Sequence, residues 1–244
     1  MPVNGAGRGR FVTFEGGEGA GKSTHCARLA ERLNAAGIAT ALTREPGGSP
    51  KAEAIRALLL EGAVKPQGPA AEALMFAAAR IDHLDSLIRP ALSAGRWVIC
   101  DRFADSTRAY QGALGGVPPR LIDALEAVAL GPTRPDLTIV LSLPVEEGLS
   151  RAGKRAGPGA AVDRFEGEAL AFHRAVLAAF LDIAAREPVR CAVLDASLPA
   201  DYVAERVWAT VKLRLMENGA FPHRARRRQV GEPRGGANPQ GARG

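Results

Sequence analysis

The stretch Phe11-Val12-Thr13-Phe14-Glu15-Gly16-Gly17-Glu18-Gly19-Ala20-Gly21-Lys22-Ser23-Thr24 sets the fold of this chain. It begins with a short apolar run typical of a buried β-strand, turns through glycines and ends where an Ala- and Leu-rich helical pattern starts. Residues 16–23 match the pattern G-x-x-x-x-G-K-[ST] in the strand–loop–helix context that this motif requires. The stretch therefore predicts a loop that binds the phosphates of a nucleoside triphosphate, rather than a glycine-rich turn that binds nothing.

The residue types of this loop suit phosphate chemistry. Glycines let backbone N–H groups approach an anion, and the start of the following helix adds further free N–H groups. Lys22 can reach the β- and γ-phosphates, and the Ser23 hydroxyl can ligate Mg²⁺. The residues expected at the triphosphate are Gly16, Gly17, Glu18, Gly19, Ala20, Gly21, Lys22, Ser23 and Thr24.

Composition narrows the class of protein. The 244 residues suit one large domain with a substantial core, with a formal net charge of +6. Three scattered cysteines without a C-x-x-C pair disfavour a disulfide framework and a zinc site, and four histidines show no metal-type spacing. We find no stretch apolar enough to span a membrane and no signal-peptide pattern, so we expect a soluble, cytoplasmic protein.

Apolar runs and helical patterns alternate along the chain. The expected strands are 10–15, 38–43, 97–102, 137–143 and 189–194. The expected helices are 22–36, one that begins at Pro50, 71–94, 106–113, 119–130, 145–152, 165–186 and 201–216. This alternation predicts an α/β fold of three layers, in which helices cover both faces of a five-stranded, mostly parallel sheet.

The chain divides into three parts. Residues 1–9 are expected to be a flexible N-terminus, and 10–216 one domain with a short basic lid at about 151–164, where Gly, Pro and Arg interrupt the helical pattern. Residues 217–244 carry six Arg against two Glu with few apolar residues, which predicts a disordered basic tail. An arm that binds RNA or lipid is the weaker interpretation of this tail.

Charged residues follow the predicted strands at their carboxyl ends, where ligands bind in open α/β sheets. Arg44 follows the second strand, and Asp101 and Arg102 end the third. Asp101 fits the metal-side aspartate of a P-loop enzyme, and the Arg102 guanidinium can bind a second phosphate. A purely structural Asp–Arg pair is the alternative.

Two helical segments carry groups suited to a nucleobase. Phe76 and Arg80 are four residues apart and therefore face the same way. A second, short helix carries hydrogen-bonding groups at Ser106, Thr107, Tyr110 and Gln111. Each signal is weak alone, since Phe76 could be core and Arg80 a surface charge.

Together these stretches resemble the bacterial type of thymidylate kinase, within the P-loop nucleoside monophosphate kinases. Besides the P-loop, the matching motifs are Thr43-Arg44-Glu45-Pro46-Gly47-Gly48, the segment 72–80, Asp101-Arg102-Phe103, the segment 106–112 and Arg134-Pro135-Asp136. They occur in family order and cover most of residues 10–215. The resemblance implies transfer of a phosphoryl group from ATP–Mg²⁺ to dTMP, which gives dTDP for dTTP biosynthesis, in a homodimer.

The resemblance also implies roles for individual residues. Phe76 would stack on thymine, Arg80 would donate to a thymine carbonyl, Tyr110 would exclude a ribose 2′-hydroxyl, and Arg102 would hold the dTMP phosphate. The full set implied at dTMP is Glu15, Arg44, Pro46, Phe76, Arg80, Arg102, Ser106, Thr107, Tyr110 and Gln111. Ser23 and Asp101 would serve Mg²⁺.

Catalysis would use Lys22, Arg102 and a cation from the lid. Some relatives carry an Arg at the position of Gly19, and its absence here points to Arg151, Lys154 or Arg155, with Arg151 and Arg155 favoured. The chain departs from the family pattern at Phe103, where Tyr, His or Trp is usual, in the extra lid residues 157–161, and in the tail.

Two rival functions remain at this point. One is a P-loop kinase for another nucleoside monophosphate or a small-molecule acceptor. The other is a nucleotide switch or nucleic-acid-binding protein that uses the basic tail, which the missing Asn-Lys-x-Asp base motif disfavours.

Overall fold

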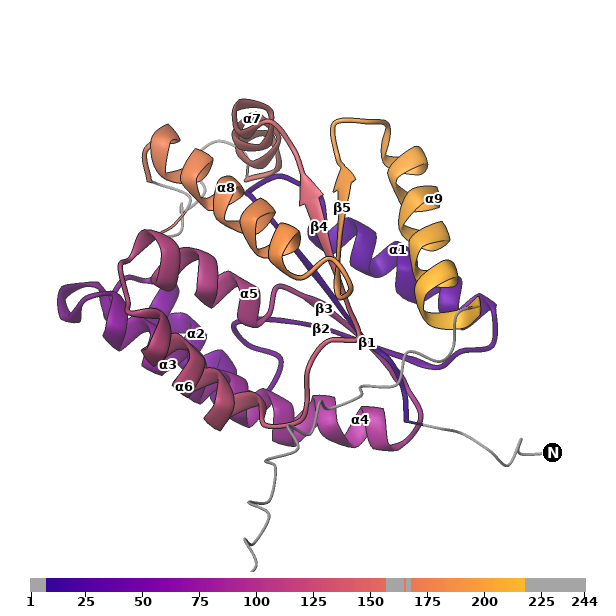
Figure 1. The fold of residues 1–244 in the computed structure, drawn as a ribbon, viewed down its shortest axis with the longest axis horizontal. Coiled ribbons are helices and arrows are strands. Elements are labelled where there is room, and N and C mark those ends of the chain that lie inside the picture. The colour runs from indigo at the N-terminus through magenta and orange to yellow at the C-terminus, as the bar shows by residue number, and fades with distance from the viewer. Residues whose placement is uncertain (1–7, 157–164, 166–167, 218–244) are drawn as a thin grey trace, which may run out of the picture.

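A single parallel sheet forms the centre of the molecule in the computed structural model, which describes residues 8–156, 165 and 168–217 (Figure 1). The strands are β1 (Phe11–Gly16), β2 (Thr40–Arg44), β3 (Trp97–Asp101), β4 (Leu137–Ser142) and β5 (Cys191–Asp195). Their order is β2-β3-β1-β4-β5, and every neighbouring pair is parallel. The predicted five-stranded α/β fold is confirmed.

Helices connect the strands close to where the sequence predicts them. They are α1 (Lys22–Ala35), α2 (Pro50–Leu60), α3 (Pro69–His83), α4 (Arg89–Ser93), α5 (Ala104–Thr107), α6 (Pro119–Leu130), α7 (Val145–Ala156), α8 (Leu170–Arg186) and α9 (Ala200–Val211). Short irregular helices complete the set: a 3₁₀ turn at Lys65–Gln67 (η1) and π-helical segments at Leu84–Ile88 (η2), Arg108–Leu114 (η3) and Lys212–Glu217 (η4). The predicted helix 71–94 is therefore α3 and α4 joined through a π-helical turn.

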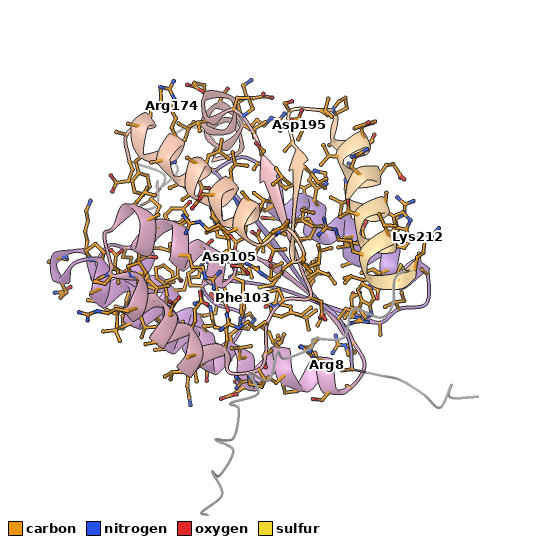
Figure 2. The ribbon with its side chains drawn as sticks, viewed as in Figure 1. Arg8, Phe103, Asp105, Arg174, Asp195 and Lys212 are labelled. Atoms are coloured by element: carbon orange, nitrogen blue, oxygen red, sulfur yellow. The ribbon has the colours of Figure 1, made fainter. Side chains whose placement is uncertain are left out.

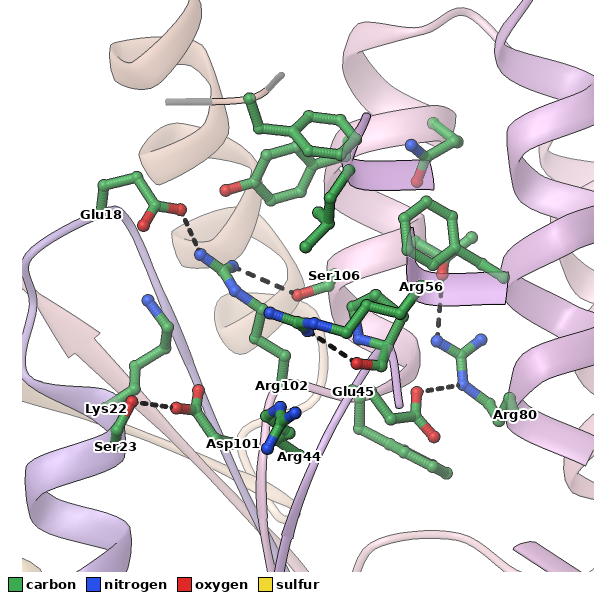
Figure 3. A pocket seen from close by; sticks show the side chains of 18 of the residues that line it. Glu18, Lys22, Ser23, Arg44, Glu45, Arg56, Arg80, Asp101, Arg102 and Ser106 are labelled. Carbon is green, nitrogen blue, oxygen red and sulfur yellow. Dashed lines mark hydrogen bonds and ion pairs between the residues drawn. The ribbon is translucent and has the colours of Figure 1, made fainter. Parts of the chain in front are cut away.

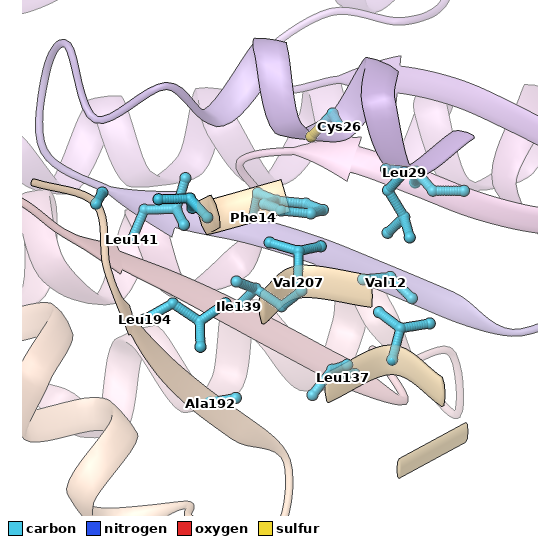
Figure 4. Close-up of a cluster of buried hydrophobic side chains, with 14 of the residues drawn as sticks. Val12, Phe14, Cys26, Leu29, Leu137, Ile139, Leu141, Ala192, Leu194 and Val207 are labelled. Carbon is cyan, nitrogen blue, oxygen red and sulfur yellow. The ribbon is translucent and has the colours of Figure 1, made fainter. Parts of the chain in front are cut away.

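Alternation along the central strands supplies a core on each face of the sheet. Val12 and Phe14 pack toward α1 and α9, in a cluster that includes Leu29, Ile139 and Val207 (Figure 4). On the opposite face Phe11, Val98 and Cys100 pack against α3, η2, α4 and α6, and Val140 packs against Val176 and Phe180 of α8. Because both faces are covered, the central strands are almost wholly apolar.

Several boundaries differ from the prediction. The helix predicted at 145–152 runs through Ala156, the last strand begins at Cys191 rather than 189, and the helix predicted at 201–216 becomes π-helical at Lys212 (Figure 2). Gly9, expected in a flexible terminus, is buried and donates its N–H to Leu92 O at 2.9 Å. Ile38, expected in the second strand, instead ends α1, since its N–H binds Leu33 O at 2.9 Å after Gly37 adopts a φ of 81°. The helix expected from 165 begins only at Leu170.

Other predictions concern residues that lie outside the part of the chain described by the structure. They are most of the flexible N-terminus (1–7), most of the lid (157–164) and the basic tail (218–244). None of the helices in the described part is long and apolar enough to cross a membrane.

Candidate active site

The predicted site residues converge on one cavity of about 250 Å³ at the carboxyl edge of the sheet (Figure 3). Its walls come from the P-loop, the β2–α2 loop, α3, the end of β3 and the α5–η3 segment. Predicted residues that line it are Glu18, Gly19, Gly21, Lys22, Ser23, Thr24, Arg44, Pro46, Phe76, Arg80, Asp101, Arg102, Ser106, Thr107, Tyr110 and Gln111. The parallel sheet gathers them because each wall follows the end of a strand or packs beside one.

The P-loop closes tightly around Lys22. Its Nζ donates to Gly17 O at 2.7 Å and Gly16 O at 3.2 Å, and the side chain is buried. Burial lowers the pKa of Lys22, and the neighbouring Arg102 lowers it further. Gly19 has a φ of 65°, and a Cβ there would lie 1.9 Å from Gly148 O. The close approach of α7 therefore excludes at Gly19 the arginine that some relatives carry.

Ser23 and Asp101 offer oxygen donors side by side, since the Ser23 hydroxyl donates to the Asp101 carboxylate. Hydroxyl and carboxylate oxygens suit Mg²⁺, which takes few protein ligands and completes its shell with phosphate oxygens and water. Within the described residues no group of three or more His, Cys, Asp or Glu side chains could hold a metal by itself. The pair fits a cation that binds together with a nucleotide.

Arg102 stands between the two halves of the cavity. It is the one non-glycine residue with a positive φ, 65°, in the described part of the chain, which places its side chain off the end of β3. Its guanidinium pairs with Glu18, lies 3.5 Å from Ser106 Oγ and sits 5.5 Å above the Tyr110 ring. A cation held in this way is available to a phosphate beside the P-loop.

Aromatic rings line the far half of the cavity. The Phe76 and Phe165 rings are 6.4 Å apart, and Phe165 meets Tyr110 edge to face at 5.3 Å. Burial raises the pKa of Tyr110 to about 12, so its hydroxyl stays protonated at neutral pH. These rings provide an apolar, uncharged seat for a flat ligand.

Buried polar groups complete this half. Arg80 is buried, and its Nε donates to Glu45 at 2.7 Å while Nη2 donates to Thr107 at 3.1 Å. Gln111 donates to Glu72 at 3.1 Å. Fixed donors beside an aromatic seat can read the edge of a base.

Five lining residues were not among the predicted site residues: Glu45, Arg56, Leu60, Phe103 and Phe165. Glu45 lies within the quoted Arg-Glu-Pro-Gly-Gly motif, so a signal for it existed. Phe165 was assigned to the start of a helix, and nothing in its local sequence indicates that it turns inward. Arg56 donates to Pro46 O at 2.7 Å, a contact that depends on how α2 packs.

Other predicted residues do not line the cavity. Gly16, Gly17 and Ala20 lie in the P-loop behind it, and Arg151 donates to Ala196 O at 3.1 Å and to Glu147 at 2.6 Å. Lys154 is exposed on α7, while the side chain of Arg155 lies outside the described residues.

Glu15 lies behind the lining and is fully buried. Its carboxyl group accepts hydrogen bonds from Phe103 N at 2.8 Å and from Ser106 Oγ at 2.7 Å. Burial, reinforced by the nearby Asp105, raises the pKa of Glu15 to about 8. Glu15 thus braces the β3–α5 loop that presents Arg102.

Comparison with known proteins gives one consistent result. A family model described as thymidylate kinase matches residues 14–207. A thymidylate kinase of Bradyrhizobium diazoefficiens is 58% identical over 215 residues, which cover 88% of this chain and 94% of that protein. One of Nitrobacter hamburgensis is 57% identical over 209 residues, covering 86% and 90%.

A solved structure agrees with these relatives. The crystal structure of thymidylate kinase from Ehrlichia chaffeensis matches with a TM-score of 0.66 and 32% identity, over 84% of this chain and 99% of that one. Sequence, fold and cavity point the same way, and the chain belongs to the thymidylate kinase family.

Proposed function

We propose that the described cavity is where this chain carries out the reaction of its family, transfer of the ATP γ-phosphoryl group to the 5′-phosphate of dTMP. The observation that carries this proposal is the meeting of two unlike halves in one cavity: P-loop groups at one end, and an aromatic seat with Arg80 at the other. A kinase for an acceptor without a base would have no use for the second half.

The donor half suits ATP with Mg²⁺. Lys22 and the P-loop amides would hold the β- and γ-phosphates, and Ser23 with Asp101 would hold the metal, which neutralises charge on the transferring group. The acceptor's phosphate oxygen is already anionic, so positioning and charge neutralisation supply the catalysis. Arg102 lies where it can hold that acceptor phosphate in line.

The acceptor half suits thymidine. Phe76 would stack on the base, Arg80 would donate to a carbonyl, and the half-buried Tyr110 ring would fill the space of a ribose 2′-hydroxyl. Ser106, Thr107, Gln111 and the Arg44–Pro46 segment complete the proposed dTMP site, and Glu15 supports it from behind. A lid cation from among Arg151, Lys154 and Arg155 would cover the phosphates.

A homodimer is supported by exposed apolar side chains on two helices that pack together, α3 and α6. Leu74 and Ile81 lie seven residues apart on α3 and are exposed, and Val128 on α6 is 77% exposed. Exposed apolar side chains grouped in this way favour a second copy as their cover. The three cysteines are free and buried, which supports a reducing compartment such as the cytoplasm.

The acceptor can be identified with a panel of nucleotides. We expect ADP release, measured with a coupled assay, to be fastest with dTMP and much slower with dCMP and UMP. The panel also includes dUMP, which differs from dTMP only in lacking the methyl group of the base. Tyr110 predicts the discrimination against UMP, and the pyrimidine edge read by Arg80 predicts that against dCMP. A preferred acceptor without a nucleobase would refute the proposed site.

Lys22 is expected to serve the transfer rather than acceptor binding. Lys22→Ala should lower kcat by about a hundredfold or more, because a charge that stabilises the transition state is lost, while the dissociation constant for dTMP changes little. Lys51→Ala, which removes an exposed lysine on α2, is the control and should keep the wild-type rate. A kcat within threefold of wild type in Lys22→Ala would contradict this role.

The raised pKa of Glu15 predicts a pH-dependent stability. Between about 4.5 and about 8 the folded state keeps a proton that the unfolded chain has released, so stability falls as pH rises through this window. Glu15→Gln keeps an oxygen for the bond from Phe103 N and offers an amide N–H to Ser106 Oγ, but it cannot ionise. We expect the free energy of unfolding of Glu15→Gln, measured by urea titration between about pH 5 and pH 9, to fall less steeply with pH than that of wild type. Titration of Glu15 alone can contribute a slope of at most about 1.4 kcal/mol per pH unit. Parallel curves for the two proteins would show that Glu15 does not titrate there.

The proposed dimer face can be tested by introducing one charged side chain into it. Val128→Asp should shift the protein from dimer to monomer in analytical ultracentrifugation, because an unpaired carboxylate would be buried at the interface. Val189→Asp is the matched control, since Val189 is 78% exposed but lies in the loop before β5. A monomeric wild type, or equal behaviour of the two variants, would exclude this face.

A further inference from the structure

Behind the aromatic seat, five side chains form a continuous buried chain of hydrogen bonds. Thr43 Oγ1 lies 2.8 Å from His83 Nε2, and His83 Nδ1 lies 3.1 Å from Glu45 Oε1. Glu45 Oε2 accepts from Arg80 Nε at 2.7 Å, and Arg80 Nη2 donates to Thr107 at 3.1 Å. These hydrogen bonds link the end of β2 to the cavity, and two of the five residues, Thr43 and His83, have no part in the proposed reaction.

His83 is fully buried at the end of α3, and both its ring nitrogens have partners. The Glu45 carboxylate, which is paired with Arg80, can only accept, so Nδ1 is the donor of the His83–Glu45 bond, and the Thr43 hydroxyl can donate to Nε2 or accept from it. The backbone is built around this ring: Gly48 has a φ of 86°, and a Cβ there would lie 2.4 Å from His83 Nε2. The second glycine of the Arg-Glu-Pro-Gly-Gly motif therefore makes room for the histidine.

Arg80, which precedes Thr107 in this series of hydrogen bonds, is held on three sides. Glu45 takes its Nε proton, Thr107 takes one Nη2 proton, and its guanidinium carbon lies 5.2 Å from the centre of the Phe103 ring. No partner for Nη1 occurs among the described residues, and Arg80 lines the cavity (Figure 3). The remaining donors are those that a ligand can meet, and their direction is set by the Glu45 carboxylate.

We propose that His83 is a positioning residue for the acceptor base: through its bond to Glu45 it fixes the carboxylate that orients Arg80. This rests on the proposed function, since it requires an acceptor whose base meets Arg80. Without the His83 donor, Oε1 of a buried carboxylate has no partner from α3, and Glu45 can rotate away from the geometry that aims Arg80. The P-loop lies at the other end of the cavity from Arg80, so we expect the effect on acceptor binding and none at the P-loop.

Two substitutions distinguish the hydrogen bond made by Nδ1 of His83 from the one made by Nε2. His83→Asn places an amide N–H near the position of Nδ1 and can keep the bond to Glu45, whereas His83→Gln places its amide near the position of Nε2 and loses it. We expect His83→Gln to raise the KM for dTMP about tenfold, because one buried hydrogen bond is lost. His83→Asn should stay within about threefold of wild type, and neither variant should change the KM for ATP.

A control on the same two elements excludes a general loosening of the fold. Ser49 Oγ donates to Asp82 at 2.6 Å, so Asp82→Asn weakens a bond between the β2–α2 loop and α3 without touching Glu45. This variant should keep the KM for dTMP. Thermal unfolding of every variant shows which ones fold, and Glu45→Gln replaces His83→Gln if that variant does not.

A double-mutant cycle with Arg80→Met decides whether His83 acts through the arginine. If it does, His83→Gln raises the KM for dTMP in the wild-type background and adds nothing when Arg80 is already absent. A tenfold effect that persists in Arg80→Met, or equal KM values for His83→Gln and His83→Asn, overturns the inference while the dTMP kinase assignment stands. A wild-type protein that neither binds nor phosphorylates dTMP overturns both.

Discussion

Three of the cations that line the cavity are buried or mostly buried, and the site depends on the carboxylates around them. Lys22, Arg80 and Arg102 are buried or mostly buried, and an unpaired charge in such a place would be very costly. Asp101, Glu18 and Glu45 lie among them, and two of these make direct ion pairs with the arginines. The cations can therefore stay charged and fixed in direction before any phosphate arrives, so that little reorganisation is left for the reaction itself.

The sheet is what brings these charges together. β1 lies at its centre, between β3 and β4, so the P-loop that follows β1 opens beside the end of β3, where Asp101 and Arg102 stand. The neighbouring β2 ends at Arg44, and Glu45 N donates to Asp101 O at 2.9 Å, which ties the loop after β2 to the end of β3. Three neighbouring strands thus bring the P-loop, Asp101 and the Glu45 carboxylate to one edge of the sheet.

Much of the fold could be predicted because its signals are local. The strand–loop–helix pattern at 11–24 identifies the P-loop without reference to the rest of the chain, and apolar runs between helices identify a parallel sheet. One error has a local cause and another a distant one. Ile38 has good strand propensity, but its N–H bonds back to Leu33 O in the turn that follows α1. The helical pattern from 165 yields to a turn in which Phe165 joins the aromatic seat beside Phe76. Glu45 was visible as a motif member, but its role depends on Arg80 and His83, which are 35 and 38 residues away in the chain.

The order of residues along the chain was enough to establish the family's chemistry: a phosphate loop, an Asp–Arg strand end and an aromatic–Arg helix face each carry their meaning within a few residues. What it could not supply is which side chains hold the chemical groups in place. That information arises only when side chains of α3 hydrogen-bond to β2, to the loop after β2 and to α5, because a bond such as that from His83 to Glu45 has no spacing rule in the sequence. Most of the residues that line the cavity follow from motifs, and the residues behind them follow from packing.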